Sequence, residues 1–98
     1  MTPIFLKDDG IGVRAEYRRG DEVTCDARAI KCPDGWIVDR IETPEEYRNR
    51  GYAQKVVKAF KDISGMPVRV LEIEPEAFDF WRKMQGRGLC KIDIGGGL

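Results

Sequence analysis

The stretch EYRNRGYAQK, residues 46–55, marks the point at which the spacing of the apolar residues along the chain changes. After Gly51, apolar residues recur every three or four positions as far as Ile63, with charged and amide side chains between them. Gly65 and Pro67 then follow, and both residue types commonly end helices. The sequence therefore predicts a charged turn around Gly51, followed by an amphipathic helix that is closed at Gly65.

Upstream of this turn, apolar and polar residues alternate, which is the pattern of half-buried strands. Strands are predicted over residues 11–17, 23–29 and 36–42. The first two are separated by a hairpin turn at RRGD, residues 18–21, and the second is followed by a turn at CPDG, residues 32–35. The sequence does not decide whether a further short strand is present at residues 3–6.

Downstream of the helix, the β-branched stretch VRVLEI, residues 68–73, predicts a short buried strand. Pro75 suits the first turn of a second helix, which ends at QGRG, residues 85–88. The apolar stripe predicted for this helix consists of Ala77, Phe78, Trp81 and Met84. A last strand is predicted at LCKIDI, residues 89–94, followed by a flexible tail at residues 95–98.

The predicted order of elements is β-β-β-α-β-α-β, in a single domain that spans residues 1–98 with its core at about residues 11–94. The fold class is α/β (α+β), with a mixed, largely antiparallel sheet and two main helices. A chain of 98 residues is long enough for one hydrophobic core. We therefore expect at most one site.

The composition limits the classes of function. Lys plus Arg and Asp plus Glu both number 17, so a net charge of zero argues against general affinity for nucleic acid or an anionic membrane. The N-terminal MTPIFLKDD has no signal-peptide pattern and no apolar run is long enough to cross a membrane, so a cytoplasmic location is expected. Three cysteines without a C-x-x-C pair, and no histidine, argue against structural disulfides, histidine-based catalysis and a metal site such as zinc.

A charged, glycine-containing turn before a helix favours anion binding. The first N–H groups of a helix have no partner within the helix and lie at the positive end of its dipole, where a phosphate binds well. Gly51 allows a ligand to approach the backbone closely, and Asn49 tolerates a left-handed conformation. Arg48 and Arg50 can add charge-assisted hydrogen bonds. The simpler alternative is that both arginines are solvated surface charges.

The residues RNRGYA, 48–53, fit the Q/R-x-x-G-x-G/A signature of the GNAT superfamily of N-acetyltransferases, which the chain resembles over about residues 11–94. EPEAFDFWRKMQGRG, residues 74–88, is similar to the second signature of that family, and the two occur in the family's order. In the family, backbone amides of the turn bind the pyrophosphate of acetyl-CoA. The resemblance therefore implies that acetyl-CoA binds at Arg48, Asn49, Arg50, Gly51, Tyr52 and Ala53.

The resemblance also implies roles for the third predicted strand. The pantetheine arm of acetyl-CoA would pair with the backbone at Ile41, Glu42 and Thr43, and a backbone N–H there would polarise the thioester carbonyl. A carboxylate, Asp39 or Glu42, would act as general base for the acceptor amine. Strand alternation places these two on opposite faces, so only one is expected to reach the cleft. The alternative is that both carboxylates only form surface ion pairs.

Three features depart from the family pattern. Trp81 stands where the family usually has a tyrosine, and its indole N–H cannot protonate a thiolate, so this side chain would pack on the pantetheine or in the core. Glu74 replaces an asparagine, and residues 85–87 replace a Gly-Phe pair. No helix pair is expected before Ile11, so the chain resembles a minimal member whose open acceptor groove suits a macromolecular amine.

Three functions remain after these considerations. The favoured one is an acetyl-CoA-dependent N-acetyltransferase that acts by direct transfer in a ternary complex on a lysine or other primary amine of a protein or other macromolecule. The second is an acyl-CoA-binding module with little or no catalysis. The third is an interaction domain whose arginine-rich turn binds an acidic partner or nucleic acid, which the neutral net charge disfavours. The oligomeric state, a homodimer included, is left open.

Overall fold

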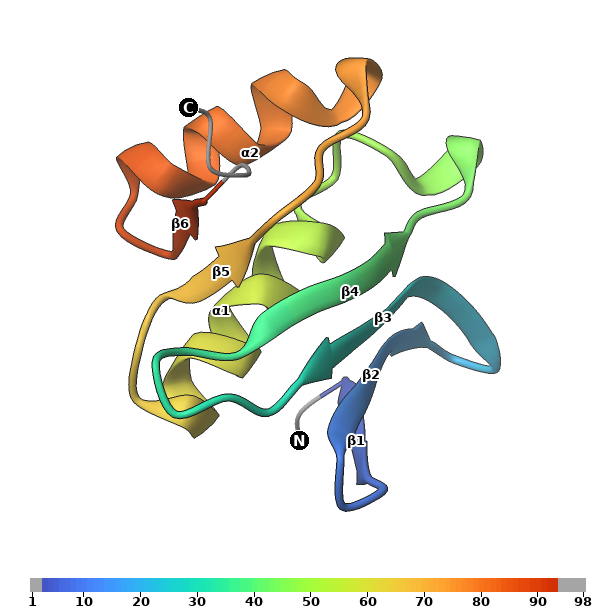
Figure 1. Ribbon diagram of the computed structural model, residues 1–98. Helices are drawn as coiled ribbons and strands as arrows, with labels where there is room; N and C mark the ends of the chain where they lie inside the picture. Colours follow the sequence, from blue (N-terminus) through green and yellow to red (C-terminus); the bar gives the residue numbers. More distant parts are fainter. Residues whose placement is uncertain (1–2, 94–98) are drawn as a thin grey trace.

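The computed structural model describes residues 3–93, which form a mixed α+β fold around one six-stranded sheet (Figure 1). The strands lie in the sheet in the same order as in the sequence, β1-β2-β3-β4-β5-β6. The predicted fold class, with a mixed sheet and two main helices, is confirmed. The end of the last predicted strand, at residue 94, and the predicted tail, residues 95–98, lie outside the described residues.

The strands are β1 (Ile4–Asp8), β2 (Gly12–Arg19), β3 (Glu22–Ile30), β4 (Ile37–Glu42), β5 (Val68–Val70) and β6 (Cys90–Ile92). The helices are α1 (Tyr52–Ser64) and α2 (Phe78–Gly86), each preceded by a short 3₁₀ turn, η1 (Glu45–Tyr47) and η2 (Pro75–Ala77). This order contains the predicted succession of strands and helices. The strand that the sequence left open is present as β1.

Strands β1 to β4 form an antiparallel meander, whereas β5 and β6 run parallel to β4. Gly20 supports the tight turn between β2 and β3 in a left-handed conformation, with φ of 64°. The two parallel strands each follow a helix, because a parallel neighbour can be reached only by a crossover connection. The antiparallel part of the sheet is therefore built from local connections, and the parallel part from α1 and α2.

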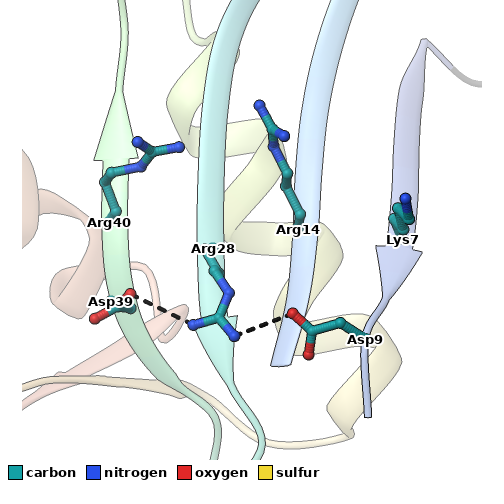
Figure 2. Close-up of a pocket in the computed structure, with 6 residues that line it drawn as sticks. All are labelled: Lys7, Asp9, Arg14, Arg28, Asp39 and Arg40. Atoms are coloured by element: carbon teal, nitrogen blue, oxygen red, sulfur yellow. Dashed lines mark hydrogen bonds and ion pairs between the residues drawn. The ribbon is translucent and has the colours of Figure 1, made fainter. Parts of the chain in front are cut away.

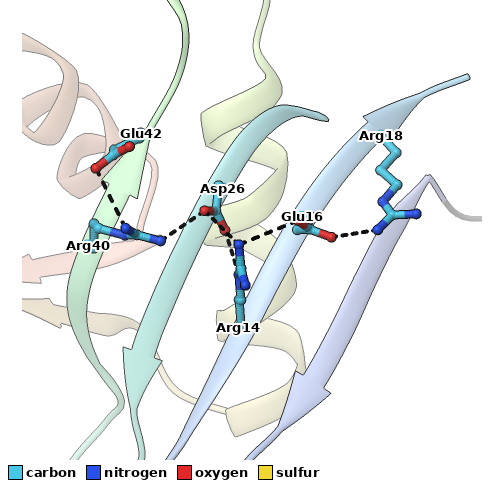
Figure 3. A network of polar contacts seen from close by, with 6 residues as sticks. All are labelled: Arg14, Glu16, Arg18, Asp26, Arg40 and Glu42. Atoms are coloured by element: carbon cyan, nitrogen blue, oxygen red, sulfur yellow. Dashed lines mark hydrogen bonds and ion pairs between the residues drawn. The ribbon is translucent and has the colours of Figure 1, made fainter. Parts of the chain in front are cut away.

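Helix α1 packs against β2, β3 and β5 and closes the hydrophobic core on one face of the sheet. Its side chains Val56, Val57 and Phe60 are fully buried, as the three- and four-residue spacing predicted. The strands beneath contribute small buried side chains, among them Ala15 and Ala27, which let the helix lie close to the sheet. In Figures 2 and 3, α1 lies behind the strands and charged side chains project from the other face, which we call the outer face.

The second helix begins later than the sequence predicted. Pro75 starts the 3₁₀ turn η2, and the α-helix follows from Phe78. Trp81 and Met84 are buried as expected. Phe78 is 41% exposed and packs under the guanidinium of Arg82 instead, so its predicted place on the buried stripe is wrong.

Strand β5 is shorter than predicted and pairs with β4 only where β4 begins. It ends at Val70, and Leu71 is already exposed. The two strands share one register position, Ile37 opposite Arg69, and the Arg69 N–H donates to the Trp36 carbonyl at 2.7 Å. Figure 1 shows the chain diverging from β4 beyond this point. The sheet therefore opens between the end of β4 and the segment that follows β5.

Among residues 3–93, no helix combines the length and the apolar character needed to cross a membrane.

Candidate functional site

A cleft of about 1150 Å³ occupies the opening between β4 and the segment that follows β5. Its walls come from the end of β4, the turn before α1, the first turn of α1, residues 72–77 and one side of α2. Segments far apart in the sequence thus meet at one place, where the sheet divides. A cleft of this size is large enough for a cofactor-sized ligand.

The structure brings most of the predicted site residues to this cleft. The lining includes Asp39, Ile41, Glu42, Thr43, Arg48, Asn49, Gly51, Tyr52, Ala53 and Trp81. Arg50 is exposed and does not belong to the lining. The predicted turn and the predicted strand end therefore both line the same cleft.

The turn before α1 has the backbone conformation that its residue types suggest. Asn49 and Gly51 are both left-handed, with φ of 63° and 83°. The first bond of the helix runs from the Lys55 N–H to the Gly51 carbonyl at 3.1 Å, and no side chain caps the helix. The first turn of α1 contains no acidic residue. The N–H groups of this turn are thus available to an anion in the cleft.

Arg48 stabilises the turn itself. Its Nε–H donates to the Thr43 carbonyl at 3.0 Å, which ties the turn to the end of β4. The pKa of Glu76 is lowered by a hydrogen bond from its own backbone N–H, by the side chain of Glu74 and by the nearby charge of Arg48. The Arg48 guanidinium is therefore held by the Thr43 carbonyl, and its charge acts on Glu76.

Two cations, Lys83 on α2 and Arg87 directly after its last residue, bring positive charge to the cleft, and sequence reasoning missed both. Lys83 and Arg87 line the cleft, and the Arg87 guanidinium donates to the side-chain oxygen of Gln54. Together with Phe80 and Met84 they follow an i, i+3, i+4, i+7 spacing, which places all four on one side of the helix. That spacing is the signal that could have identified them. They supply positive charge where Arg50 does not.

Three glutamates of the segment that follows β5 also line the cleft and were missed: Glu72, Glu74 and Glu76. Glu74 and Glu76 share a side-chain hydrogen bond, and this bond together with the charge of Glu76 raises the pKa of Glu74. The three lie at every second position after β5, a regular spacing that is visible in the sequence. The lining of the cleft therefore contains both acidic and basic side chains.

A β-bulge places Asp39 at the edge of the cleft. Arg28 lies opposite Arg40 and Ala29 opposite Val38, so Asp39 has no partner on β3. Asp39 pairs with Arg28 at 3.6 Å, and Glu42 approaches Arg40 at 3.8 Å (Figures 2 and 3). Both carboxylates thus reach the outer face and line the cleft. The prediction that strand alternation separates them is wrong, because the bulge shifts the alternation by one residue.

A second pocket, of about 710 Å³, lies on the outer face next to the cleft (Figure 2). We call it the outer pocket, and its lining consists of Lys7, Asp9, Arg14, Arg28, Asp39 and Arg40. Asp39 and Arg40 line both spaces. The bulged part of β4 is therefore the boundary between the cleft and the outer pocket.

Trp81, Cys25 and Cys90 are part of the core rather than reactive groups. Trp81 is 3% exposed, packs edge-on against Phe80 at a ring-centroid distance of 4.9 Å, and reaches the cleft along one side. The Cys90 thiol lies 3.6 Å from the Trp81 carbonyl, and burial raises its pKa to about 11. Burial also raises the pKa of Cys25. Within residues 3–93, no group of three or more Cys, Asp or Glu is placed to hold a metal ion.

The carboxylate of Asp9 should make the stability of the fold depend on pH. The backbone N–H of Gly12, the guanidinium of Arg28 and the backbone N–H of Ile11 lower the pKa of Asp9 from 3.8 to about 2. Because the pKa is lower in the folded state, the ionised carboxylate of Asp9 stabilises the fold. This stabilisation is complete above about pH 4 and is lost as the pH falls towards 2.

We therefore expect Asp9→Asn to lose less stability than the wild type between pH 4 and 2, measured by urea unfolding at several pH values. The two stability curves should converge at the acid end of this interval. Parallel curves across the whole interval would contradict the assigned hydrogen bonds.

Comparison with models of known protein families gave no match for this chain, and comparison with curated proteins gave none of significance. Three features of the structure bear on the function of this protein. These are the uncapped first turn of α1, the cleft at which the sheet divides, and the outer pocket beside it.

Proposed function

We propose that this protein is an acetyl-CoA-dependent N-acetyltransferase that transfers the acetyl group directly to a primary amine of a macromolecular partner. The observation that carries the proposal is the uncapped N-terminus of α1, which opens into the cleft between the diverging β4 and β5. A long, anionic, amide-containing donor needs both an anion site and a neighbouring strand edge. These two features occur here side by side.

The anion site suits the pyrophosphate of acetyl-CoA. A Cβ atom added at Gly51 would meet no other atom within 4 Å, so there is open space directly above the turn. The N–H groups of Tyr52 and Ala53 and the positive end of the helix dipole favour an anion in that space. Lys83 and Arg87 bring positive charge from α2. These residues, rather than Arg50, would neutralise the pyrophosphate.

The strand edge suits the pantetheine arm. Within residues 3–93, β4 has no register partner on its β5 side after Ile37, so some of its backbone N–H and C=O groups face the cleft. The two amide groups of pantetheine can pair with such groups at Ile41, Glu42 and Thr43. Trp81 and Phe80 provide an apolar wall for the remainder of the arm.

The chemistry requires removal of a proton from the acceptor amine. Asp39 and Glu42 are the carboxylates of β4 that line the cleft, and either can accept this proton directly or through a water. Attack by the amine nitrogen forms a C–N bond and breaks the C–S bond of the thioester, and sulfur leaves as a thiolate. Thiols have pKa values of about 8.5, so a thiolate can leave near neutral pH without a protein acid. This route does not require a tyrosine at position 81, where this chain has Trp81.

We propose that the chain forms a minimal GNAT-like core with an open acceptor side. A cytoplasmic setting is part of the proposal, and it is supported by the three unpaired cysteines, Cys25, Cys32 and Cys90. The acceptor side is open because the outer pocket lies at the surface of the sheet. A side chain on a protein could reach Asp39 from there.

A second candidate is an acyl-CoA-binding module without efficient turnover. Buried Trp81 favours it, since the indole cannot donate a proton to the thiolate and its 3% exposure leaves little freedom to move. The two candidates share the donor site and differ only in catalysis.

The test combines acetyl-CoA titration by calorimetry with an assay of acceptor-dependent CoA release. We expect saturable acetyl-CoA binding by the wild type, and release of CoA in the presence of lysine-containing peptides. Replacing the general base, by Asp39→Asn or Glu42→Gln, should lower kcat by roughly 100-fold or more while acetyl-CoA affinity is retained.

Glu16→Gln is the matched control, because Glu16 is an ion-paired carboxylate of the same outer face that lines neither the cleft nor the outer pocket. Absence of binding at millimolar acetyl-CoA would contradict both candidates. Acetyl-CoA binding without any release of CoA would favour the second candidate, the acyl-CoA-binding module.

A further inference from the structure

We propose that the outer pocket binds an acidic segment of the acceptor protein, so that the lysine to be acetylated has aspartate or glutamate neighbours. This inference rests on the proposed function and specifies its acceptor. Its basis is a row of cations that crosses the outer face next to the cleft (Figure 2).

The cations lie directly opposite one another on four adjacent strands. Lys7 of β1 pairs in register with Arg14 of β2, Arg14 with Arg28 of β3, and Arg28 with Arg40 of β4. We call these four residues the cationic row. Like charges at directly opposed positions of a sheet are destabilising, so this arrangement has a cost in the free protein.

Carboxylates beside the row offset only part of this cost (Figure 3). Asp26 accepts hydrogen bonds from Arg14 and Arg40, at 3.1 and 2.9 Å, and Asp9 accepts one from Arg28 at 3.1 Å. Most N–H donors of the three guanidinium groups have no acceptor within residues 3–93.

Within the lining of the outer pocket, cations outnumber carboxylates. Its lining contains four cations, which are the members of the cationic row, against two carboxylates, Asp9 and Asp39. Lys7 has no ion-pair partner among the described residues. A ligand with several carboxylates would satisfy the remaining donors and relieve the repulsion within the row.

The length of the row fits an extended peptide. Neighbouring strands are about 4.8 Å apart, so three steps from β1 to β4 span roughly 14 Å. An extended chain rises about 3.3 Å per residue, so a segment of about four residues covers the row. A small metabolite would cover only part of it. The geometry therefore favours a protein segment over a free amino acid.

The position of the row places the acceptor lysine at the cleft. Arg40, at one end of the row, and Asp39, beside it, line both the outer pocket and the cleft. An acidic segment bound along the row could extend a lysine past Arg40 towards Asp39, where its amine is attracted by the carboxylate. Basic neighbours of that lysine would instead be repelled by the row.

Nucleic acid fits this surface less well. Acidic residues flank the row on both sides, with Glu16, Asp26 and Glu42 on one side and Asp9 and Asp39 on the other. A phosphate backbone wider than the row would meet these charges. The net charge of zero provides no wider attraction either.

The test compares two lysine peptides of equal length, in which the lysine is flanked by aspartates or by arginines. Binding to the wild type is followed by NMR titration in the presence of acetyl-CoA, and acetyl-CoA binding is measured in the same samples. The aspartate peptide should bind roughly tenfold more tightly or better, with an affinity that falls as salt is added.

The double variant Arg14→Gln, Arg28→Gln should remove this preference. Arg18→Gln is the matched control: Arg18 is an ion-paired arginine of the same strand and face that lies outside the outer pocket, so the preference should be kept. Circular dichroism and acetyl-CoA affinity report whether each variant is folded.

The possible failures are distinguishable. Normal acetyl-CoA binding with no preference for the aspartate peptide would overturn the acceptor assignment and leave the donor site intact. Failure of acetyl-CoA itself to bind would overturn the proposed function, and the acceptor assignment with it. Displacement of the aspartate peptide by a thymidine oligonucleotide that binds more tightly would identify the outer pocket as a nucleic-acid site and overturn the inference.

Discussion

Replacing Gly51 with aspartate is expected to abolish acetyl-CoA binding at concentrations that saturate the wild type. Gly51 precedes the uncapped first turn of α1, and the space above it is open. A carboxylate in that space would be juxtaposed with the pyrophosphate, and like-charge contacts of this kind cost several kcal/mol. We therefore expect the Kd to rise by at least ~100-fold. Isothermal titration calorimetry with acetyl-CoA measures this directly.

Gly65 offers a closely matched control. It has φ of 79°, against 83° at Gly51, and a Cβ there would also meet no atom within 4 Å. It lies at the other end of α1 and does not line the cleft. Gly65→Asp should therefore carry a similar backbone strain, of about 1 kcal/mol, with unchanged acetyl-CoA affinity. Equal affinities for both variants would exclude the turn as the pyrophosphate site.

Replacing Phe60 with alanine is expected to destabilise the protein strongly. Phe60 is fully buried under the sheet, with the Trp36 ring 6.2 Å away between centroids. Removing a buried phenylalanine side chain costs about 3–5 kcal/mol, because transfer energy is lost and a cavity remains. Domains of this size have unfolding free energies of about 5–15 kcal/mol, so the substitution would remove a large fraction of the free energy of unfolding. Urea unfolding followed by circular dichroism measures the change.

Ile63→Ala tests whether the loss of stability in Phe60→Ala is due to burial of the side chain and not to its position in α1. Ile63 lies on the same helix, three residues later, and is 49% exposed. The substitution should cost less than ~1.5 kcal/mol, since alanine has the better helix propensity and little buried surface is removed. A loss as large as that of Phe60→Ala would mean that the two faces of α1 have been assigned wrongly.

The parts of the fold that depend on local sequence could be predicted. The spacing after Gly51 and the glycine at Gly65 defined α1 at both ends, because both glycines adopt the left-handed conformation that their positions require. The hairpin at Gly20 followed from alternation on either side of a turn. Buried Val56 and Phe60 follow from the same helical spacing. In each case, neighbours along the chain contained the necessary information.

The rest depended on contacts between distant strands. The bulge at Asp39 moves two carboxylates to the same face, and no residue near it in the sequence indicates an unpaired position. Strand β5 ends at Val70 because β4 diverges from it, although the β-branched pattern continues to Ile73. The cationic row depends on register across three strand pairs, two of which contain an irregularity. Alternation alone cannot specify that register.

Only some of the cleft residues could be predicted, because the others depend on contacts between distant segments. The turn from Arg48 to Ala53 was visible as a motif, and its conformation at Asn49 followed from the residue type. Lys83 lies in α2 and Arg87 directly after it, and the orientation of this helix relative to α1 was not known from the sequence. Arg50 was included because it lies in the motif, yet its side chain is not part of the lining.

The single register position between β4 and β5 has a consequence for the cooperativity of folding. In the meander of β1 to β4, each pair of strands shares five or more register positions. Strand β5 joins this meander through Ile37 and Arg69 and through packing against α1, and β6 pairs with β5. Regions joined so sparsely can open separately from the rest of a domain, in a partial unfolding reaction. A ligand in the cleft would contact both regions at once. Its binding would therefore merge two folding units into one, in addition to raising the midpoint of unfolding.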